Sequence, residues 1–344
     1  MQYAADVERS DGTRTRETLA ATTGDRIPDG AAVLAGHGVQ VGVWRWPQDP
    51  ALPALATAAD PVRVSEALQT AGLARHGVPR VRMRSYRPGR RAVLEVEGGG
   101  PRLYLKVVRP KAVTALRARH ELLAEHVPVP RPLAATADGM LVLSECPGTS
   151  LRSQLSRDLP APSPADLDAL LDSLPPALLD LPRRRTHLER VPHFTAVLAG
   201  TAVTGKAERA QLDALAATLA QADPGTHPDI AVHGDFYDGQ LLCGEQQVTG
   251  LVDVDTAGPG HRVDEWATLL AHLSVLALHG TAAARRYGAR VLDHAEERFA
   301  RAQLRPRVAA AVLGLATGPF RVQQPRWEEH TRARLQLAAE WAGG

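Results

Sequence analysis

Two neighbouring stretches decide how this sequence is interpreted: HGDFYDGQLL at residues 233–242 and VTGLVDVD at residues 248–255. Each combines a short apolar run with turn residues, and the pattern predicts two short strands joined by a hairpin. Asp235 lies five residues before Gln240, and Asp253 lies at the end of the second strand. Oxygen-bearing side chains of this kind are what a hard cation and its phosphates require. The hairpin is therefore expected to gather the three side chains into one site.

The residues upstream predict an antiparallel meander with one principal helix. Pro88-Gly89 and three glycines at 98–100 separate short runs rich in β-branched and apolar residues. An amphipathic stretch then predicts a helix, which Pro128 and Pro130 would end. Strands are expected at Val39–Trp46, Val81–Tyr86, Ala92–Glu97, Leu103–Val108 and Met140–Leu143, and helices at Val62–Ala74 and Thr114–Glu125.

The character of the chain changes after this point. Residues 151–222 are rich in Ala and Leu and predict helices, a second β-rich segment spans Ile230–Val254, and the pattern from Asp264 onward is again helical. A β-meander with one helix followed by a mainly helical half predicts an α+β fold with two lobes. The expected lobes are 1–145 and 146–344.

The first thirty residues are polar and charged. They include turn signals such as Gly24-Asp25, and they predict a loose or partly helical leader over residues 1–30. They contain no apolar core of a signal peptide. Apolar stretches further on, such as Trp266–Leu278, are interrupted by polar residues, so no segment is expected to span a bilayer. The expected location is the cytoplasm.

The overall composition is that of an ordinary globular protein. Of the 344 residues, 44% are hydrophobic and 23% are charged, and the formal net charge is +2. These values disfavour disorder, a nucleic-acid-binding surface and a membrane-binding surface. Cys146 and Cys243 are too few for a disulfide framework, and no CxxC pair indicates a zinc site. Lysine occurs only at positions 106, 111 and 206, so a lysine inside an apolar strand is informative.

The hairpin has the layout of the protein-kinase catalytic site. There, a catalytic-loop Asp is followed five residues later by an amide side chain and then by a metal-binding Asp on the next strand. HGDFYDGQLL and VTGLVDVD resemble the motifs of the aminoglycoside phosphotransferases and related small-molecule kinases, which have a protein-kinase-like fold. The resemblance implies that Asp235 is catalytic and orients the attacking hydroxyl, and that Gln240 and Asp253 hold Mg²⁺. It covers roughly residues 80–320.

The upstream half of the chain agrees with this resemblance. Lys106, in the strand sequence LYLKVV, matches the family's phosphate-binding lysine, and Glu121 on the next helix would pair with it. The run LVLSECPG at 141–148 resembles the hinge that meets adenine through backbone groups. The resemblance therefore implies nucleotide contacts at Ser144 and Cys146.

Two departures from the family pattern are visible. The family usually has Asn where this chain has Gln240, although maltokinase-like members resemble this chain in having Gln. Glutamine offers the same carbonyl oxygen on one more methylene. The loop at 86–91 has a single glycine, unlike the glycine-rich loop of protein kinases, and Arg90 and Arg91 there are more simply explained as solvated side chains than as phosphate ligands.

The predicted reaction is direct, Mg²⁺-dependent transfer of a phosphoryl group from ATP or GTP to a hydroxyl group of a small molecule. The acceptor classes are a sugar, a nucleoside, a polyol or an aminoglycoside-type antibiotic. A polycationic acceptor needs a pocket rich in carboxylates, yet residues 261–344 contain eight acidic residues and twelve arginines. That balance favours a neutral or anionic acceptor.

Two alternatives remain open at this point. A non-catalytic kinase-like module would bind nucleotide without magnesium, and the change to Gln240 permits it. A metal-dependent phosphatase or hydrolase is suggested by the sequence DVDT at 253–256 after an apolar strand. The second alternative requires a doubly wound domain built mostly downstream of that motif.

Overall fold

The structure is a computed structural model that describes residues 2–23, 27–201 and 205–343, so the predicted turn at Gly24-Asp25 lies outside the described residues. The chain divides into two compact units. The first comprises Met1–Glu121 and Pro130–Glu145, and the second comprises Leu122–Val129 and Cys146–Gly344.

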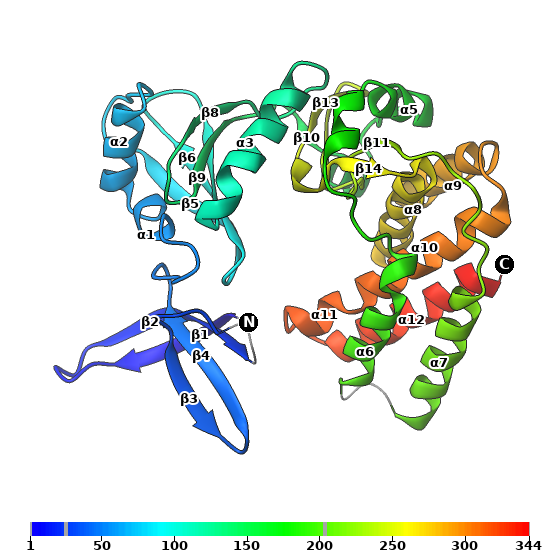
Figure 1. The fold of residues 1–344 in the computed structure, drawn as a ribbon, viewed down its shortest axis with the longest axis horizontal. Helices are drawn as coiled ribbons and strands as arrows, with labels where there is room; N and C mark the ends of the chain where they lie inside the picture. Colours follow the sequence, from blue (N-terminus) through cyan, green and yellow to red (C-terminus); the bar gives the residue numbers. More distant parts are fainter. Residues whose placement is uncertain (1, 24–26, 202–204, 344) are drawn as a thin grey trace. The chain divides into compact units, whose positions relative to one another are not determined.

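A five-stranded antiparallel sheet forms the centre of the first unit, in the order β5-β6-β7-β9-β8 (Figure 1). Its strands are β5 (Arg80–Arg87), β6 (Arg91–Glu97), β7 (Leu103–Val108), β8 (Pro132–Ala135) and β9 (Met140–Ser144). The predicted meander is confirmed, and β8 is a strand that the sequence pattern did not indicate. Each strand pair is antiparallel, as the short glycine-containing turns between β5, β6 and β7 require.

Helices pack on the two faces of this sheet. Helix α3 (Pro110–Ala124) contributes Val113 and Leu116 to a cluster with Leu141 of β9. Helices α1 (Leu55–Ala58) and α2 (Pro61–Thr70) pack on the other face, where Leu68 joins Leu105 of β7. The side-chain period of two in each strand explains why neighbouring residues such as Leu141 and Val142 belong to different clusters.

The prediction of a loose leader over residues 1–30 is wrong. A second antiparallel sheet has the order β1-β2-β4-β3, with β1 (Gln2–Glu8), β2 (Arg14–Thr23), β3 (Ala32–Gly36) and β4 (Val39–Arg45). Strand β4 was predicted, and a strand of this kind needs partners for its backbone groups. Strand β2 is one of these partners. It pairs with β4 so that Ala20 lies opposite Trp44, and both side chains are buried. The threonines in β2 suit a strand better than a helix.

A buried hydrogen-bond network ties this second sheet to the turn between β5 and β6. Trp44 Nε1 donates to the Tyr86 hydroxyl at 2.9 Å, and that hydroxyl donates to Asp49 Oδ2 at 2.8 Å. The amide of Gly89 donates to the same carboxylate oxygen at 2.7 Å. All three side chains are buried. The network therefore fixes the conformation of the turn that precedes β6.

Replacing Tyr86 by Phe removes one acceptor and one donor from this network. We expect the free energy of unfolding to fall by about 1–3 kcal/mol, because Trp44 Nε1 is left buried without an acceptor and Asp49 loses a donor. Urea unfolding followed by tryptophan fluorescence measures the change. Tyr104→Phe is the matched control, since its hydroxyl lies 3.5 Å from Glu95 in a part-buried contact. An equal fall in the free energy of unfolding for Tyr86→Phe and Tyr104→Phe would contradict the claim that the network stabilises the fold.

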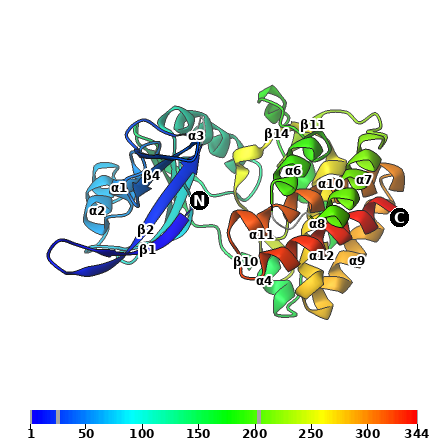
Figure 2. The same ribbon diagram turned by 90° about the horizontal axis from the view of Figure 1, so that it is seen from below.

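The second unit is built around three long helices. Helices α8 (Arg262–His279), α10 (Arg301–Ala316) and α12 (Trp327–Gly343) pack together, and Figure 1 shows α10 between the other two. Figure 2 shows the same helices from below. The six consecutive residues 308–313 of α10 are all buried, as expected for a helix that is covered on every side. Trp266 of α8 is fully buried in the same core. The prediction of helices from Asp264 onward is confirmed.

The remaining helices of this unit surround the core. They include α4 (Leu151–Ser156), α5 (Pro164–Asp172), η2 (Pro176–Asp180), η3 (Leu188–Arg190), α6 (Val191–Ala199), α7 (Lys206–Ala220), α9 (Ala282–Glu296) and α11 (Gly318–Arg321). The prediction of helices over 151–222 is confirmed. Among the described residues, no helix is both long and apolar enough to cross a membrane.

Two small antiparallel sheets complete the second unit. One has the order β10-β12-β13, with β10 (Thr149–Ser150), β12 (Leu241–Gly244) and β13 (Gln247–Leu251). The other pairs β11 (Ile230–Val232) with β14 (Gly258–Gly260). The predicted hairpin is confirmed as β12 and β13, followed by the short helix η4 (Val254–Thr256).

The phosphatase or hydrolase alternative is wrong. It requires a doubly wound, largely parallel sheet downstream of Asp253. Every strand pair formed by the described residues is antiparallel, and the residues after β14 form helices.

Candidate active site

The loop that carries Asp235 begins where β11 ends at Val232. Gly234 has φ of 77°, a left-handed conformation that favours glycine. A Cβ atom on Gly234 would lie 2.6 Å from the Thr256 carbonyl oxygen, so a larger residue would not fit. The glycine of the HGD motif is therefore required both by its conformation and by its close approach to η4.

Glu265 from α8 holds this loop in place. Its two carboxylate oxygens accept the amide of His233 at 2.7 Å and the amide of Gly234 at 2.9 Å. The side chain is buried, and this burial raises the pKa of Glu265 to about 7, although the two amide donors oppose the shift. Glu265 thus fixes the backbone amides of the two residues that directly precede Asp235.

His233 links the loop to the strand that leads to Asp253. Its Nδ1 accepts the Asp235 amide at 3.3 Å, which leaves Nε2 to donate to the Val252 carbonyl at 3.0 Å. Burial lowers the pKa of His233, so the ring is neutral, as this pattern of one acceptor and one donor requires. The backbone carbonyl of His233 accepts the Thr256 hydroxyl at 2.8 Å.

The hairpin brings Gln240 and Asp253 together as predicted. Gln240 Nε2 lies 3.4 Å from Asp253 Oδ2 and donates to the Tyr237 hydroxyl at 3.0 Å. The backbone amide of Val252 donates to the backbone carbonyl of Gln240 at 2.9 Å, and this bond fixes the two backbone segments relative to each other. Asp253 has φ of 59° and ψ of 48°, a left-handed conformation that is uncommon outside glycine and is often found at functional sites.

These residues fit a magnesium ion. Mg²⁺ is usually held by one or two carboxylates together with substrate phosphates and water, rather than by protein ligands alone. In the described part of the chain, no group of three or more His, Cys, Asp or Glu side chains is placed to hold a metal. Turning the Gln240 amide about its last bond would present Oε1 beside Asp253, with the Tyr237 hydroxyl as a donor to it. The extra methylene of Gln240 does not keep the amide away from Asp253.

The first unit contains the predicted lysine. Lys106 lies in β7 and is buried, and its partners in register are Val93 and Leu141. It shares a sheet face with Leu141, which packs against α3. Glu121 near the end of α3 is half-exposed and pairs with Arg117, one turn earlier, at 2.8 Å. The ion pair between Lys106 and Glu121 stays a prediction.

The predicted hinge residues lie on either side of the boundary between the two units. Ser144 belongs to the end of β9, where its amide donates to the Arg131 carbonyl and its hydroxyl accepts the Arg131 amide, both at 2.9 Å. Cys146 begins the next segment of the second unit, with Sγ 3.9 Å from the Pro128 carbonyl. Nucleotide contacts by Ser144 and Cys146 remain a prediction.

The comparison with known families decides what kind of protein this is. Residues 83–307, about two thirds of the chain, match the family described as the phosphotransferase enzyme family, APH. The chain belongs to this family. The matched segment includes Lys106, Asp235, Gln240 and Asp253, so the family assignment and the site geometry concern the same residues. No curated protein matches the chain.

Solved structures of antibiotic phosphotransferases share this fold. Macrolide 2'-phosphotransferase MphH from Brachybacterium faecium is 17% identical, with a TM-score of 0.52 over 80% of this chain and 98% of that one. A thermostable mutant of aminoglycoside phosphotransferase APH(4)-Ia in a ternary complex with ADP and hygromycin B is 15% identical, with a TM-score of 0.57 over 82% and 99%. At these identities the likeness concerns the fold, and it confirms the predicted protein-kinase-like architecture.

Several residues around the site of this phosphotransferase were not predicted from the sequence. Tyr237 stacks on His272 of α8 at 3.9 Å between ring centroids. The fully buried Asp238 pairs with Arg152 of α4 at 2.7 Å. Tyr237 and Asp238 lie inside the motif HGDFYDGQLL at residues 233–242, so their position in the sequence could have indicated that they are near the site. Glu265 had only a weak signal, because it stands at the start of a helix where a carboxylate usually interacts with the helix itself.

Replacing Glu265 by Gln should destabilise the second unit by about 1–3 kcal/mol, because one of the two amides would face an NH₂ group and lose its acceptor. Urea unfolding at pH 8 measures this change, and phosphoryl transfer should fall with it because Asp235 follows the released amides. Glu297→Gln is the control, since that side chain is 72% exposed. A Glu265→Gln protein as stable and active as the parent would contradict the anchoring role.

The raised pKa of Glu265 also predicts a pH dependence of stability. Because its folded pKa of about 7 exceeds the ordinary value of 4.5, the folded protein binds a proton that the unfolded chain does not between these values. The contribution of this group to stability should therefore increase as pH falls from 7 to 4.5. Comparing unfolding of the parent and Glu265→Gln across this range isolates the effect. A difference that stays constant with pH would show that the pKa is not raised.

Proposed function

We propose that this phosphotransferase moves the γ-phosphoryl group of ATP or GTP to a hydroxyl group of a small molecule in a reaction that needs Mg²⁺. The observation that carries the proposal is the approach of Gln240 to Asp253 at 3.4 Å, one loop away from an Asp235 whose backbone is held by Glu265. The proposal is supported by the order of these residues, because phosphoryl transfer in the kinase fold uses a catalytic-loop Asp followed by an amide and a second Asp that hold the metal.

Each residue has a distinct role in the proposed reaction. Asp235 orients the acceptor hydroxyl and takes its proton as the acceptor oxygen bonds to the γ-phosphorus and the bond to the β,γ-bridging oxygen breaks. Gln240 and Asp253 hold Mg²⁺, which neutralises charge on the phosphate oxygens when it is bound. Lys106 binds the α- and β-phosphates, and Ser144 and Cys146 belong to the segment that meets the base. Positioning and charge stabilisation supply most of the rate, because the transition state is loose.

Nucleotide use is supported by related structures. The solved neighbours include APH(4)-Ia with ADP or AMP-PNP and hygromycin B, and aminoglycoside 2'-phosphotransferase-IIIa with GDP. These structures hold both adenine and guanine nucleotides, so they support a nucleotide donor without choosing between ATP and GTP. The acceptor is a sugar, nucleoside, polyol or aminoglycoside-type compound, and its hydroxyl is the group that reacts.

Replacing Asp235 by Ala tests the catalytic role. We expect kcat to fall at least about 100-fold, because the acceptor hydroxyl loses its proton acceptor, while nucleotide affinity changes by less than about twofold. Steady-state assays of nucleotide consumption and calorimetric titration with ADP measure the two quantities. Asp293→Ala on the exposed side of α9 is the control. Turnover near the parent level in Asp235→Ala would remove this residue from the mechanism.

Replacing Asp253 by Asn tests whether the protein is a magnesium-dependent enzyme or a non-catalytic nucleotide-binding module. In the parent, we expect Mg²⁺ to strengthen ADP binding, and in Asp253→Asn this magnesium-dependent gain should shrink at least about tenfold because a charged ligand becomes a neutral one. Calorimetry with and without Mg²⁺ gives both affinities. Nucleotide binding by the parent that is indifferent to Mg²⁺ would favour the non-catalytic module.

A further inference from the structure

Tyr237 is packed so that its ring has little freedom to move. The ring stacks on that of His272 in α8, with 3.9 Å between the ring centroids and 13° between the planes. The backbone of the loop also comes close to the ring, because a Cβ atom on Gly239 would lie 2.5 Å from Tyr237 Cε2. A glycine at position 239 therefore makes room for the ring. These contacts fix the position of the tyrosine hydroxyl.

The residue after Tyr237 is anchored to a different helix. The fully buried Asp238 accepts two hydrogen bonds from Arg152 of α4, from Nε to Oδ2 at 2.7 Å and from Nη2 to Oδ1 at 3.3 Å. Arg152 Nη2 also lies 3.3 Å from His272 Nδ1, which must accept this bond because a guanidinium has donors only. Helices α4 and α8 thus hold two successive residues of the loop, and this bond joins the two helices to each other.

The hydroxyl of the held tyrosine reaches Gln240. Gln240 Nε2 donates to the Tyr237 hydroxyl at 3.0 Å and lies 3.4 Å from Asp253 Oδ2. The Gln240 side chain is buried. A glutamine has one more rotatable bond than an asparagine and loses more freedom when it is ordered. The hydroxyl therefore restrains, before any metal binds, a side chain that the metal would otherwise have to order.

The hydroxyl can bond the Gln240 amide in either orientation. Only the oxygen of the amide can bind a cation, because the NH₂ group is a donor. In the structure the NH₂ group faces Asp253, and a half-turn of the amide exchanges its nitrogen and oxygen. The Tyr237 hydroxyl accepts a hydrogen bond in the first orientation and can donate one in the second. The restraint therefore persists in the orientation that Mg²⁺ requires.

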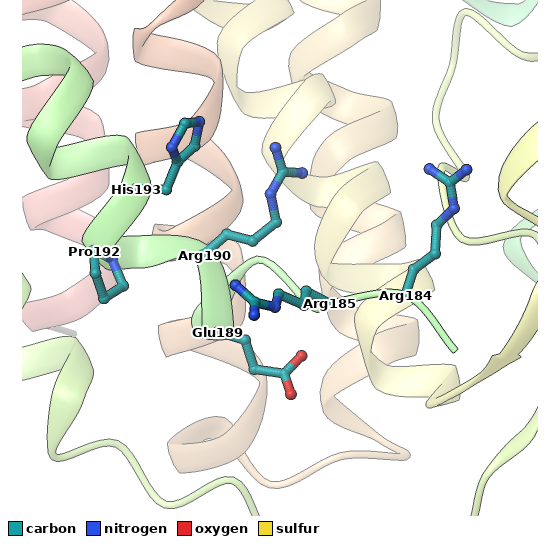
Figure 3. A pocket seen from close by; sticks show the side chains of 6 residues that line it. All are labelled: Arg184, Arg185, Glu189, Arg190, Pro192 and His193. Atoms are coloured by element: carbon teal, nitrogen blue, oxygen red, sulfur yellow. The ribbon is translucent and has the colours of Figure 1, made fainter. Parts of the chain in front are cut away.

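Asp253, the partner of Gln240 in the predicted metal site, has supports of its own. It directly precedes the short helix η4. Arg184, which lines the cavity shown in Figure 3, donates to the backbone carbonyl of Asp255 in this helix at 3.3 Å. This bond does not involve Tyr237. A change at Tyr237 should therefore act on Gln240 rather than on Asp253.

We propose that Tyr237 is a positioning residue for the magnesium ligand Gln240, and that it allows glutamine to replace the asparagine that protein kinases use. Its hydroxyl keeps the longer side chain beside Asp253 and donates to Oε1 when this oxygen faces Mg²⁺. The inference rests on the proposed function, because it takes Gln240 as a ligand of Mg²⁺. It predicts that the hydroxyl matters for magnesium binding only while residue 240 is glutamine.

Tyr237→Phe tests the role of the hydroxyl, because it keeps the stacked ring. Calorimetric titration with ADP, with and without Mg²⁺, measures the gain in affinity that Mg²⁺ brings. This gain should fall about three- to tenfold, since the Gln240 side chain must then be ordered when the metal binds. The affinity for ADP without Mg²⁺ should change by less than about twofold.

Tyr287→Phe is the matched control for this change. Its hydroxyl is buried in the same unit and has no hydrogen-bond partner among the described residues, so its removal should leave the magnesium-dependent gain as it is in the parent. Circular dichroism melting shows whether each variant is folded. Loss of the folded state in Tyr237→Phe would assign the hydroxyl a purely structural role and would overturn the proposal.

A second background shows whether the effect of Tyr237 passes through Gln240. Gln240→Asn keeps the ligand oxygen but shortens the side chain by one methylene, which withdraws the amide from the tyrosine hydroxyl. A magnesium-dependent gain should persist in this variant, and adding Tyr237→Phe to it should change the gain by less than about twofold. A merely structural role of Tyr237 would lower the gain equally in both backgrounds.

The possible results separate this inference from the proposed function. An unchanged gain in Tyr237→Phe, an equal loss in Tyr287→Phe, an equal loss in the two backgrounds or absence of the gain in Gln240→Asn would each overturn the inference. The proposed function would survive these results as long as Mg²⁺ strengthens ADP binding by the parent. Binding by the parent that is indifferent to Mg²⁺ would overturn both.

Discussion

One buried carboxylate, that of Glu265, anchors the loop of the HGD motif. Glu265 accepts two successive backbone amides, and the residue after the second of them is Asp235. Glu265 is followed by Trp266, which is fully buried in the helical core of the same unit. The packing of α8 thus helps to position the loop, together with the hydrogen bonds that His233 makes within it and to Val252. Burying a carboxylate is unfavourable, and the raised pKa of Glu265 reflects this cost, which the two amide donors offset in part.

The fold was largely predictable because its signals are local. Turn residues and alternating strands indicated the meander, and the hairpin of Gln240 and Asp253 followed from the spacing of apolar runs and carboxylates. The first sheet of the chain was missed because β2 is mostly polar and becomes a strand through its pairing with β4. The pattern of residues 14–23 alone does not contain the information that Trp44 lies opposite Ala20.

The parts of the site that escaped prediction depend on contacts between distant residues. The pairing of Arg152 with Asp238 joins positions 86 residues apart, and the amides of the HGD motif are held by a residue about thirty positions later.

The hydrogen bonds among Trp44, Asp49 and Tyr86 bear on how small a working version of this enzyme can be. The segment that matches the family begins at residue 83, yet the Tyr86 hydroxyl and the Gly89 amide within it rely on a carboxylate from residue 49. A chain trimmed to the family boundary would expose these polar groups and the apolar surface beneath Trp44. The compact N-terminal unit is therefore larger than the part of it that matches the family, because it also includes strands β1 to β4, which lie before residue 83.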